Sequence, residues 1–302
     1  MAMTDTQKRI LKLKEEKQAL ILSHYYVPLD VQEVSDFVCD SFEMAKKAKA
    51  AKERLVVICG VHFMGESAKI LSPDKKILLP ASDAGCPMAD TVTVEDVNAL
   101  RAAHPDAAVM CYVNSSAAVK AVSDVCCTSS SALRIAEALP NDEIIFIPDR
   151  NLGGYTAEKV PNKSFFCHTG CCPVHDELTE ADVINAKSAH PAAKFAVHPE
   201  CRAEVLKHAD FIGSTAEIIE YCKAPGIDEI IIGTECGVVS RLEQDIPDKR
   251  FFLAAESFVC EDMKKVTAEA VLACLENEQF EITLAPELIR AAEDSLNKMI
   301  SM

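Results

Sequence analysis

Three cysteines in this 302-residue sequence stand at nearly equal intervals, each a few residues after an apolar run. They are Cys86, Cys172 and Cys260, which are 86 and 88 residues apart. Thiolates are the usual protein ligands of iron–sulfur clusters, normally four for each cubane. A site with three cysteines leaves one iron without a protein ligand, and such an iron acts as a Lewis acid toward a substrate oxygen or nitrogen. The spacing therefore predicts a catalytic iron–sulfur cluster, provided that the fold brings the three loops together.

Other uses of cysteine fit these three positions less well. A structural zinc site needs four ligands at short spacings, and no fourth ligand stands near these three. The CxxC pairs of zinc ribbons and thioredoxin-like sites are absent from the sequence. Of the 14 cysteines in the chain, we expect about two-thirds to be buried as small apolar side chains. Examples in apolar, strand-like contexts are Cys59, Cys111 and Cys167.

One of the three ligand positions is ambiguous, because Cys171 and Cys172 are adjacent. The pairs Cys86-Pro87 and Cys172-Pro173 align when the two loops are compared, and this register favours Cys172 as the ligand. For a single cysteine, burial would be the simpler interpretation. Three equivalent positions are harder to explain by packing alone.

Groups suited to proton transfer follow another set of apolar runs. The three segments are His24-Tyr25-Tyr26, Tyr112-Val113-Asn114 and His198-Pro199-Glu200. Histidine, tyrosine and glutamate at strand ends are natural proton-transfer groups. His24 and His198 occupy equivalent places, and His175 stands three residues after Cys172, within reach of the same cavity. We interpret four further histidines as structural, namely His62, His104, His190 and His208.

Three serines form a possible anion site. Ser41, Ser129 and Ser214 each follow a short apolar run and stand where a helix is expected to begin. The run from Ser214 to Glu217 has the pattern of a capping box. For any one of these serines, capping its own helix is the simpler interpretation. Three helix N-termini aimed at one axis would nevertheless bind an anion such as a carboxylate or phosphate.

These residues recur because the sequence contains an internal triplication. Residues 19–41, 107–130 and 193–215 each read as a strand, a polar turn, an amphipathic helix and a second strand after an aspartate. The aspartates are Asp36, Asp124 and Asp210, separated by 88 and 86 residues. Two further sets of segments recur in each unit. Residues 55–71, 142–160 and 228–246 each read as a strand, a glycine-containing turn and a helix, and residues 75–90, 163–178 and 250–265 each read as a strand, a short loop and a cysteine.

Strands that alternate with helices predict parallel sheets joined by right-handed crossovers. We expect an α/β fold of three pseudo-symmetric repeats, each a small parallel-sheet αβα sandwich, around a central active site. The expected repeats are residues 1–87, completed by 266–302, then 88–173 and 174–265. The end of the chain, from Phe280, is expected to add one strand and one helix to the first repeat. Loops at the carboxyl ends of the strands form the binding edge of such sheets.

Charge and hydropathy exclude several classes of function. The formal net charge is −16, whereas nucleic acids and acidic membranes require clustered positive charge on their partner. The apolar runs are of strand length and fall far below the roughly 20 residues that span a bilayer. The charged N-terminal segment lacks the apolar core of a signal peptide. We therefore expect a cytoplasmic protein that acts on small molecules.

Several of these segments together resemble the quinolinate synthase family, the cluster-dependent enzymes of NAD biosynthesis, over about residue 20 to the C-terminus. The motifs that carry the resemblance are HYY at 24–26, DFVCDS at 36–41, GCPMAD at 85–90, YVNS at 112–115, DRNLG at 149–153, CPVH at 172–175, VHPE at 197–200, GST at 213–215, GTE at 233–235 and VCEDMKK at 259–265.

The resemblance implies a fold, a cofactor and an activity. It implies one [4Fe–4S] cluster per chain on Cys86, Cys172 and Cys260. It implies condensation of iminoaspartate with dihydroxyacetone phosphate to quinolinate, with loss of phosphate and two waters. A transient contact with the enzyme that supplies iminoaspartate is a further expectation.

The resemblance also implies roles for individual residues. Tyr26, His198 and Glu200 are expected to form the acid–base group. The residues expected to bind phosphate and carboxylates are His24, Ser41, Tyr112, Asn114, Ser129, His175, Ser214 and Thr215.

Two positions depart from the family pattern. Cys236 replaces the usual aliphatic residue and is interpreted as a packing residue, and Cys260 has no CxxC partner for a redox-switch disulfide.

Two other classes of protein are alternatives to an enzyme for these residues. A non-enzymatic iron–sulfur redox sensor would use the same cysteines to report oxygen or iron, but it leaves His24, Tyr26 and Glu200 unexplained. A repeat-built protein that binds sugars or amino acids would need no cysteine at the three ligand positions. The sensor is therefore the stronger alternative.

Overall fold

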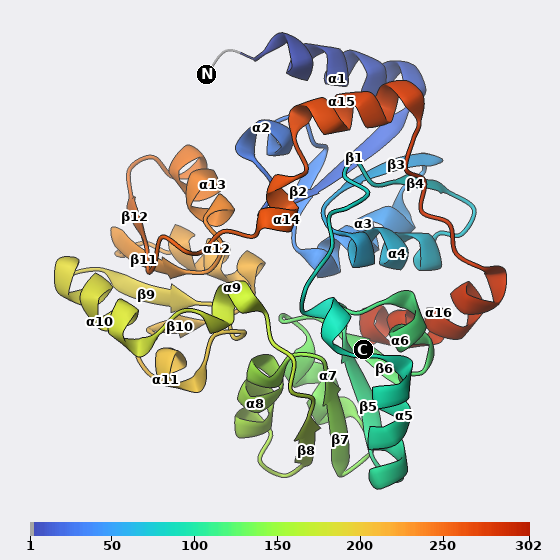
Figure 1. Ribbon diagram of the computed structural model, residues 1–302. Helices are drawn as coiled ribbons and strands as arrows, with labels where there is room; N and C mark the ends of the chain where they lie inside the picture. The colour runs from blue at the N-terminus through green and yellow to red at the C-terminus, as the bar shows by residue number, and fades with distance from the viewer. Residues whose placement is uncertain (1–2) are drawn as a thin grey trace.

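The computed structural model describes residues 3–302, and its strands and helices fall into three similar groups (Figure 1). The first group contains α1 (Asp5–Lys17), β1 (Ala19–His24), α2 (Leu29–Gln32), β2 (Phe37–Cys39), α3 (Ser41–Ala50), β3 (Leu55–Cys59), α4 (His62–Leu71) and β4 (Lys76–Leu78). The second contains a 3₁₀ turn (Ala89–Thr91), α5 (Val94–Ala103), β5 (Ala108–Tyr112), α6 (Ala117–Ala121), β6 (Val125–Cys127), α7 (Ala132–Ala138), β7 (Glu143–Ile147), α8 (Arg150–Lys159) and β8 (Ser164–Cys167). The third contains α9 (Pro173–Asp176), α10 (Glu180–Ala189), β9 (Lys194–Val197), α11 (Ala203–Leu206), β10 (Phe211–Ile212), α12 (Thr215–Lys223), β11 (Glu229–Gly233), α13 (Gly237–Asp245) and β12 (Arg250–Leu253). The chain ends with α14 (Glu261–Lys264), α15 (Ala268–Asn277) and α16 (Pro286–Ser301).

The three groups form three parallel sheets of identical topology. The strand orders are β2-β1-β3-β4, β6-β5-β7-β8 and β10-β9-β11-β12. Strands β1, β3 and β5 are buried at every residue, as expected for parallel strands with helices on both faces. The predicted α/β fold of three repeated parallel-sheet units is therefore confirmed. The boundaries of the repeats in the sequence stay a prediction.

The three spaced aspartates have one shared structural role. In each unit the aspartate lies just before the second strand and binds the first strand twice. One carboxylate oxygen accepts the N–H of a first-strand residue, and the aspartate N–H donates to the carbonyl of that residue. The pairs are Asp36 with Ile21 (2.8 and 2.9 Å), Asp124 with Val109 (2.7 and 3.0 Å) and Asp210 with Phe195 (2.9 and 2.9 Å). This confirms the register of the triplication, so equivalent residues can be read off by counting from these aspartates.

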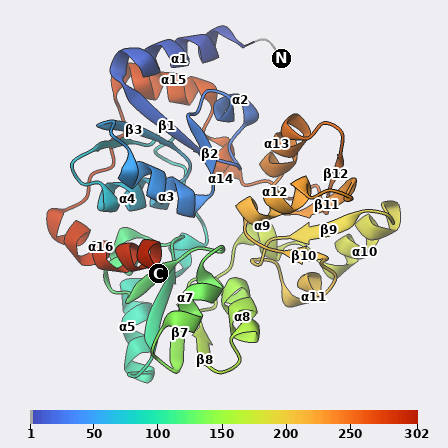
Figure 2. The same cartoon turned by 180° about the vertical axis from the view of Figure 1, so that it is seen from behind.

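The three units surround a common centre. The unit of β1–β4, the unit of β5–β8 and the unit of β9–β12 form three lobes that Figure 1 and the view from behind in Figure 2 both separate clearly. The loops that follow the strands face the space between the lobes. No helix within residues 3–302 has both the length and the apolar character needed to cross a membrane.

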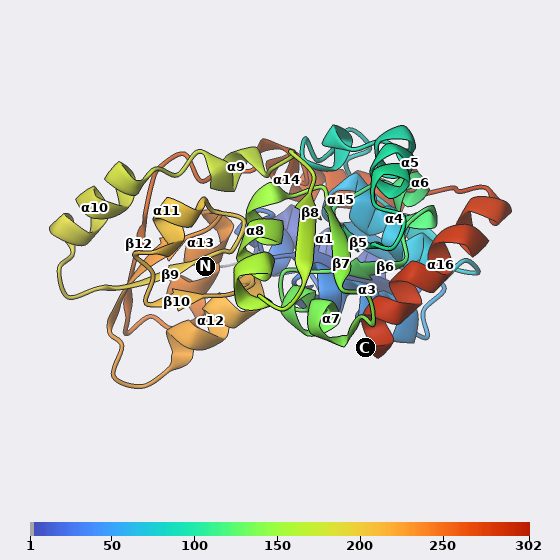
Figure 3. The ribbon, with the colours of Figure 1, turned by 90° about the horizontal axis from the view of Figure 1, so that it is seen from below.

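The end of the chain differs in part from the expectation. No strand forms after Phe280; instead an antiparallel bridge joins Glu281 to Leu78 at the edge of β4. Helix α15 packs against α1 in the first unit. Helix α16 packs against α6 and β6 of the second unit as well as against α4 of the first (Figure 3). The amphipathic α16 thus covers apolar surface of two units, which a reading by sequence order alone does not predict.

Candidate active site

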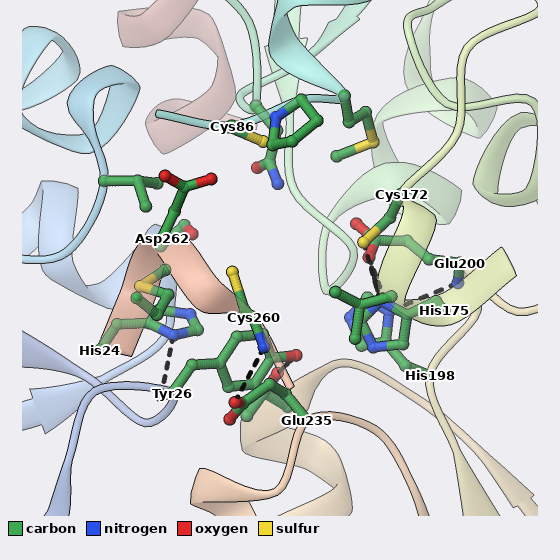
Figure 4. A pocket seen from close by; sticks show the side chains of 18 of the residues that line it. His24, Tyr26, Cys86, Cys172, His175, His198, Glu200, Glu235, Cys260 and Asp262 are labelled. Carbon is green, nitrogen blue, oxygen red and sulfur yellow. Dashed lines mark hydrogen bonds and ion pairs between the residues drawn. The ribbon is translucent and has the colours of Figure 1, made fainter. Parts of the chain in front are cut away.

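A cavity of about 520 Å³ lies where the three units meet, and residues from each unit line it. Cys86, Cys172 and Cys260 are the three cysteines among residues 3–302 that line this cavity. Figure 4 shows their sulfur atoms on different sides of the cavity, each pointing inward. The expected convergence of the three loops is therefore seen in the fold.

The local structure around the three cysteines is the same. Each cysteine begins a helical turn, so its carbonyl accepts the N–H of the residue four positions later: Asp90, Asp176 and Lys264, at 3.2, 2.9 and 3.2 Å. Each sulfur also faces the backbone N–H of the residue three positions later: Ala89, His175 and Met263. Such N–H groups stabilise a thiolate. The three loops therefore present their sulfurs in one common way.

These cysteines fit a group of several metal atoms better than a single ion. Metal–ligand bonds of about 2.0–2.3 Å keep all ligands of one ion within roughly 4.6 Å of each other. Within the described chain, ligand atoms that close together belong to Cys172, His175 and Glu200. Cys86 and Cys260 line the same cavity without joining that group, as expected if a larger core lies between the three sulfurs.

Burial makes these thiols poor acids without a metal. Desolvation raises the pKa of Cys86 to about 12 and that of Cys260 to about 11. It raises the pKa of Cys172 well above its ordinary value, with a further contribution from Glu200. A coordinating metal removes the thiol proton outright. The donor set is therefore chemically suited to a cationic cofactor.

A buried carboxylate and two histidines lie beside Cys172. His175 Nδ1 is 2.7 Å from Glu200 Oε2, and His198 Nδ1 is 3.6 Å from the same oxygen. The rings of His175 and His198 stack with centroids 4.7 Å apart. Burial acts to raise the pKa of Glu200, but His198, His175 and a hydrogen bond from Tyr112 hold it at about 2. Glu200 is therefore ionised inside the cavity.

Two histidines are neutral and share one arrangement. His24 Nδ1 accepts the N–H of Tyr26, and His198 Nδ1 accepts the N–H of Glu200, both at 3.3 Å. Burial lowers the pKa of each to about 3, and mutual repulsion with His198 adds to the effect at His24. A neutral imidazole that accepts at Nδ1 carries its proton on Nε2. Both rings therefore offer an N–H donor at the end of the first strand of their unit.

We expect His24 to make the stability of the metal-free protein depend on pH. The folded chain holds its pKa near 3, whereas an unfolded histidine titrates near about 6.5. Between these values the unfolded state binds one more proton, so the free energy of unfolding falls by about 1.4 kcal/mol for each unit of pH decrease.

Urea unfolding between about pH 4.5 and pH 6 checks this, with the wild-type slope exceeding that of His24→Asn by about 1.4 kcal/mol per pH unit. Other titrating groups cancel in this difference. Equal slopes would contradict the lowered pKa of His24.

A hydrogen-bonded chain joins Tyr26 to Glu200 across two units. Tyr26 Oη lies 2.9 Å from Thr215 Oγ1 and 2.8 Å from Thr234 Oγ1. Thr234 Oγ1 is in turn 2.9 Å from His175 Nε2, on the ring whose other nitrogen contacts Glu200. Thr234 is fully buried. It was not among the predicted site residues, although the GTE run at 233–235 ends a strand at the binding edge and contains it.

One of the residues predicted for the anion site, Ser214, does not line the cavity. Counting five residues from Asp36, Asp124 and Asp210 leads to Ser41, Ser129 and Thr215, and all three line the cavity. Ser214 is one position out of register. It is fully buried and caps α12, where its Oγ accepts the N–H of Glu217 at 3.4 Å.

The helix starts also differ from one another. The capping box at Ser214–Glu217 is confirmed. Ser41 is the first residue of α3, whose N-cap is Asp40. The expectation that Ser129 opens a helix is wrong, because α7 begins three residues later and Ser131 stands at its N-cap.

All the predicted site residues except Ser214 line the cavity: His24, Tyr26, Ser41, Cys86, Tyr112, Asn114, Ser129, Cys172, His175, His198, Glu200, Thr215 and Cys260. Cys171 does not line it. The side-chain oxygen Oδ1 of Asn114 is buried without a hydrogen-bond partner. A ligand that donates a hydrogen bond would satisfy it, since buried acceptors are rarely left unpaired.

Known proteins with similar sequences belong to the family that the motifs resemble. The family described as Quinolinate synthetase A protein matches residues 8–301. The quinolinate synthase of Caldicellulosiruptor bescii is 49% identical over 293 residues, which cover 97% of either chain. Quinolinate synthase 2 of Methanosarcina acetivorans is 47% identical over 294 residues, 97% of this chain and 94% of its own. The quinolinate synthase of Alkaliphilus metalliredigens is 44% identical over 293 residues, 97% of either chain.

Proposed function

The chain belongs to the quinolinate synthase family, enzymes of NAD biosynthesis, and we propose that it condenses iminoaspartate with dihydroxyacetone phosphate. The products are quinolinate, phosphate and two waters. The observation that carries the proposal is one cavity lined by three equivalent cysteines together with the buried Glu200 and its two histidines. As a biosynthetic enzyme for a small molecule, it is expected to work in the cytoplasm and to meet the supplier of iminoaspartate only transiently.

A [4Fe–4S] cluster, one per chain, is the cofactor that suits the three thiols. Cys86, Cys172 and Cys260 would hold it, and one iron would remain without a protein ligand. When bound, the cluster supplies a Lewis acid that polarises a substrate oxygen. The equivalent loops around the three cysteines support this assignment.

The hydroxyl groups of Ser41, Ser129 and Thr215 suit the anionic groups of the substrates. They come from the same position in the three units, at the carboxyl ends of the sheets. Tyr112 and the unpaired oxygen of Asn114 line the same cavity and suit the polar atoms of a bound carbon chain. We assign phosphate and carboxylate binding to this group.

Proton transfer is assigned to Glu200, His198 and Tyr26. Glu200 is ionised and accepts a proton, whereas the neutral His198 donates from Nε2. Burial, with Glu200 nearby, raises the pKa of Tyr26 well above its ordinary value, so the phenol keeps its proton and acts as a donor. Enolisation and dehydration need such paired donors and acceptors within one closed site.

Two measurements on anaerobically purified protein test the proposed function. The first is iron and sulfide content, with about four of each expected per chain. The second is the formation of quinolinate, followed by mass spectrometry, from iminoaspartate and dihydroxyacetone phosphate. Bound iron without quinolinate formation would favour the redox sensor, and absence of both would refute the proposal.

Thr234 is expected to matter for the rate through the hydrogen-bonded chain. Thr234→Val keeps the shape of the side chain but removes the partner of His175 Nε2 and leaves Tyr26 Oη with Thr215 alone. Unpaired buried groups cost about 1–3 kcal/mol, so kcat should fall about 10-fold or more with little change in KM. Thr234→Ser restores the hydroxyl and should return most of the rate. Steady-state kinetics of the two variants check this, and a Val variant as active as the Ser variant would contradict it.

A further inference from the structure

We propose that Asp149 and Glu235 are equivalent positioning residues that hold the backbone of two cluster-binding cysteines. The inference rests on the proposed function for the identity of the cofactor. Both residues stand two positions after the third strand of their unit, since β7 ends at Ile147 and β11 at Gly233. Both side chains are fully buried. Neither residue was among the predicted site residues.

Each carboxylate accepts the N–H of a cysteine. Asp149 Oδ2 accepts from Cys172 N at 3.0 Å, and Glu235 Oε1 accepts from Cys260 N at 3.2 Å. Figure 4 shows Glu235 beside Cys260 at the edge of the cavity. The contact therefore recurs in two units on carboxylates of different length, which indicates that the interaction with the cysteine N–H is the shared feature.

The second oxygen of each carboxylate accepts an N–H from the helix that follows the third strand of the same unit. Asp149 Oδ1 accepts from Leu152 N in α8, and Glu235 Oε2 accepts from Gly237 N in α13, both at 2.7 Å. Each carboxylate thus clamps a cysteine loop to the start of the helix that follows the third strand. An amide at either position would have one acceptor oxygen for two N–H groups.

The backbone of the same turn adds a second link. We call the second position after the third strand, where Asp149 and Glu235 stand, the clamp position. In each unit the N–H of the next residue donates to the carbonyl two residues before the cysteine. The pairs are His62 with Ala84, Arg150 with Gly170 and Cys236 with Phe258, at 2.9, 2.7 and 2.8 Å. The backbone link is present in all three units, whereas the carboxylate is present in two.

The first unit has Val61 at the clamp position. Its cysteine loop is held from another unit, because Gly85 N donates to Asp262 Oδ1 at 3.2 Å. Cys172 and Cys260 therefore depend on carboxylates of their own units, and Cys86 does not. Glu235 has one more partner, Lys264 Nζ at 2.7 Å, which also donates to the carbonyl of Tyr26.

Groups that orient metal ligands typically change metal affinity by about 10- to 100-fold when they are replaced. We expect Asp149→Asn and Glu235→Gln to release iron to a chelator about 10-fold faster than wild type under anaerobic conditions. The electron paramagnetic resonance spectrum of the reduced cluster should also change shape, because the cysteine directions shift. A matched control is Asp124→Asn, which removes a carboxylate that also accepts a backbone N–H but does not line the cavity. Its release rate should stay within about twofold of wild type, well below the 10-fold scale of ligand-orienting groups.

The outcomes separate the inference from the proposed function. A wild-type protein that takes up no iron would refute the proposed function and this inference with it. A wild-type protein that holds iron, with wild-type release rates and spectra in both variants, would refute the inference alone. Because the two carboxylates contact different cysteines, either variant tests the inference if the other does not fold. Equal acceleration in Asp124→Asn would also overturn it, since the effect would then be general loosening.

Discussion

Replacement of Cys86, Cys172 or Cys260 by alanine is expected to abolish quinolinate formation and to lower the iron content. Each of these sulfurs lines the central cavity from a different unit, so no neighbouring thiol lies in an equivalent place to take over. Loss of one ligand leaves two thiolates for a cluster that normally has four protein ligands. Iron and sulfide analysis, together with the quinolinate assay on each purified variant, measures both effects.

Three other cysteines serve as controls for this prediction. Cys59→Ala removes a fully buried sulfur from β3, and Cys236→Ala removes one that contacts Glu235 Oε1 without lining the cavity. Cys171→Ala tests the neighbour of Cys172. All three variants should keep their iron and their turnover. Full activity in Cys172→Ala would transfer the ligand role to Cys171.

Glu200→Gln is expected to lower kcat by about 100- to 10,000-fold, the usual contribution of a general acid or base. The substitution keeps the volume of the side chain but removes the ionised acceptor that faces His175 and His198. Because the group acts on protons, KM for either substrate should change much less than kcat. Steady-state kinetics and the iron content of the same preparation are the measurements.

A matched control lies on the protein surface. Glu180 forms a similar pair with His208, at 2.7 Å from Nε2, but both side chains are solvent-exposed in part and neither lines the cavity. Glu180→Gln should leave kcat and iron content unchanged. If Glu200→Gln lost its iron together with its activity, Glu200 would instead be a metal ligand, consistent with its closeness to Cys172.

The fold and the meeting of the three cysteine loops were predicted from the internal repeat, and the family from the sequence motifs. The spacing of the aspartates established which residues are equivalent, and parallel βα units place equivalent loops at the same edge of their sheets. This reasoning led from Cys86, Cys172 and Cys260 to one shared cavity. The same count separates two neighbouring candidates: five residues after Asp210 stands Thr215, which lines the cavity, whereas Ser214 caps its helix one position earlier.

The sequence by itself determined the fold class, the family and a set of candidate site residues that, apart from Ser214, line the cavity, because these depend on patterns within one unit and on their repetition. Only the tertiary structure decided which groups of different units touch. Tyr26 meets Thr215 and Thr234 from 189 and 208 residues away, and α16 covers parts of two units. Such contacts depend on how three complete units pack together, and that packing is set by the whole apolar core rather than by any local pattern.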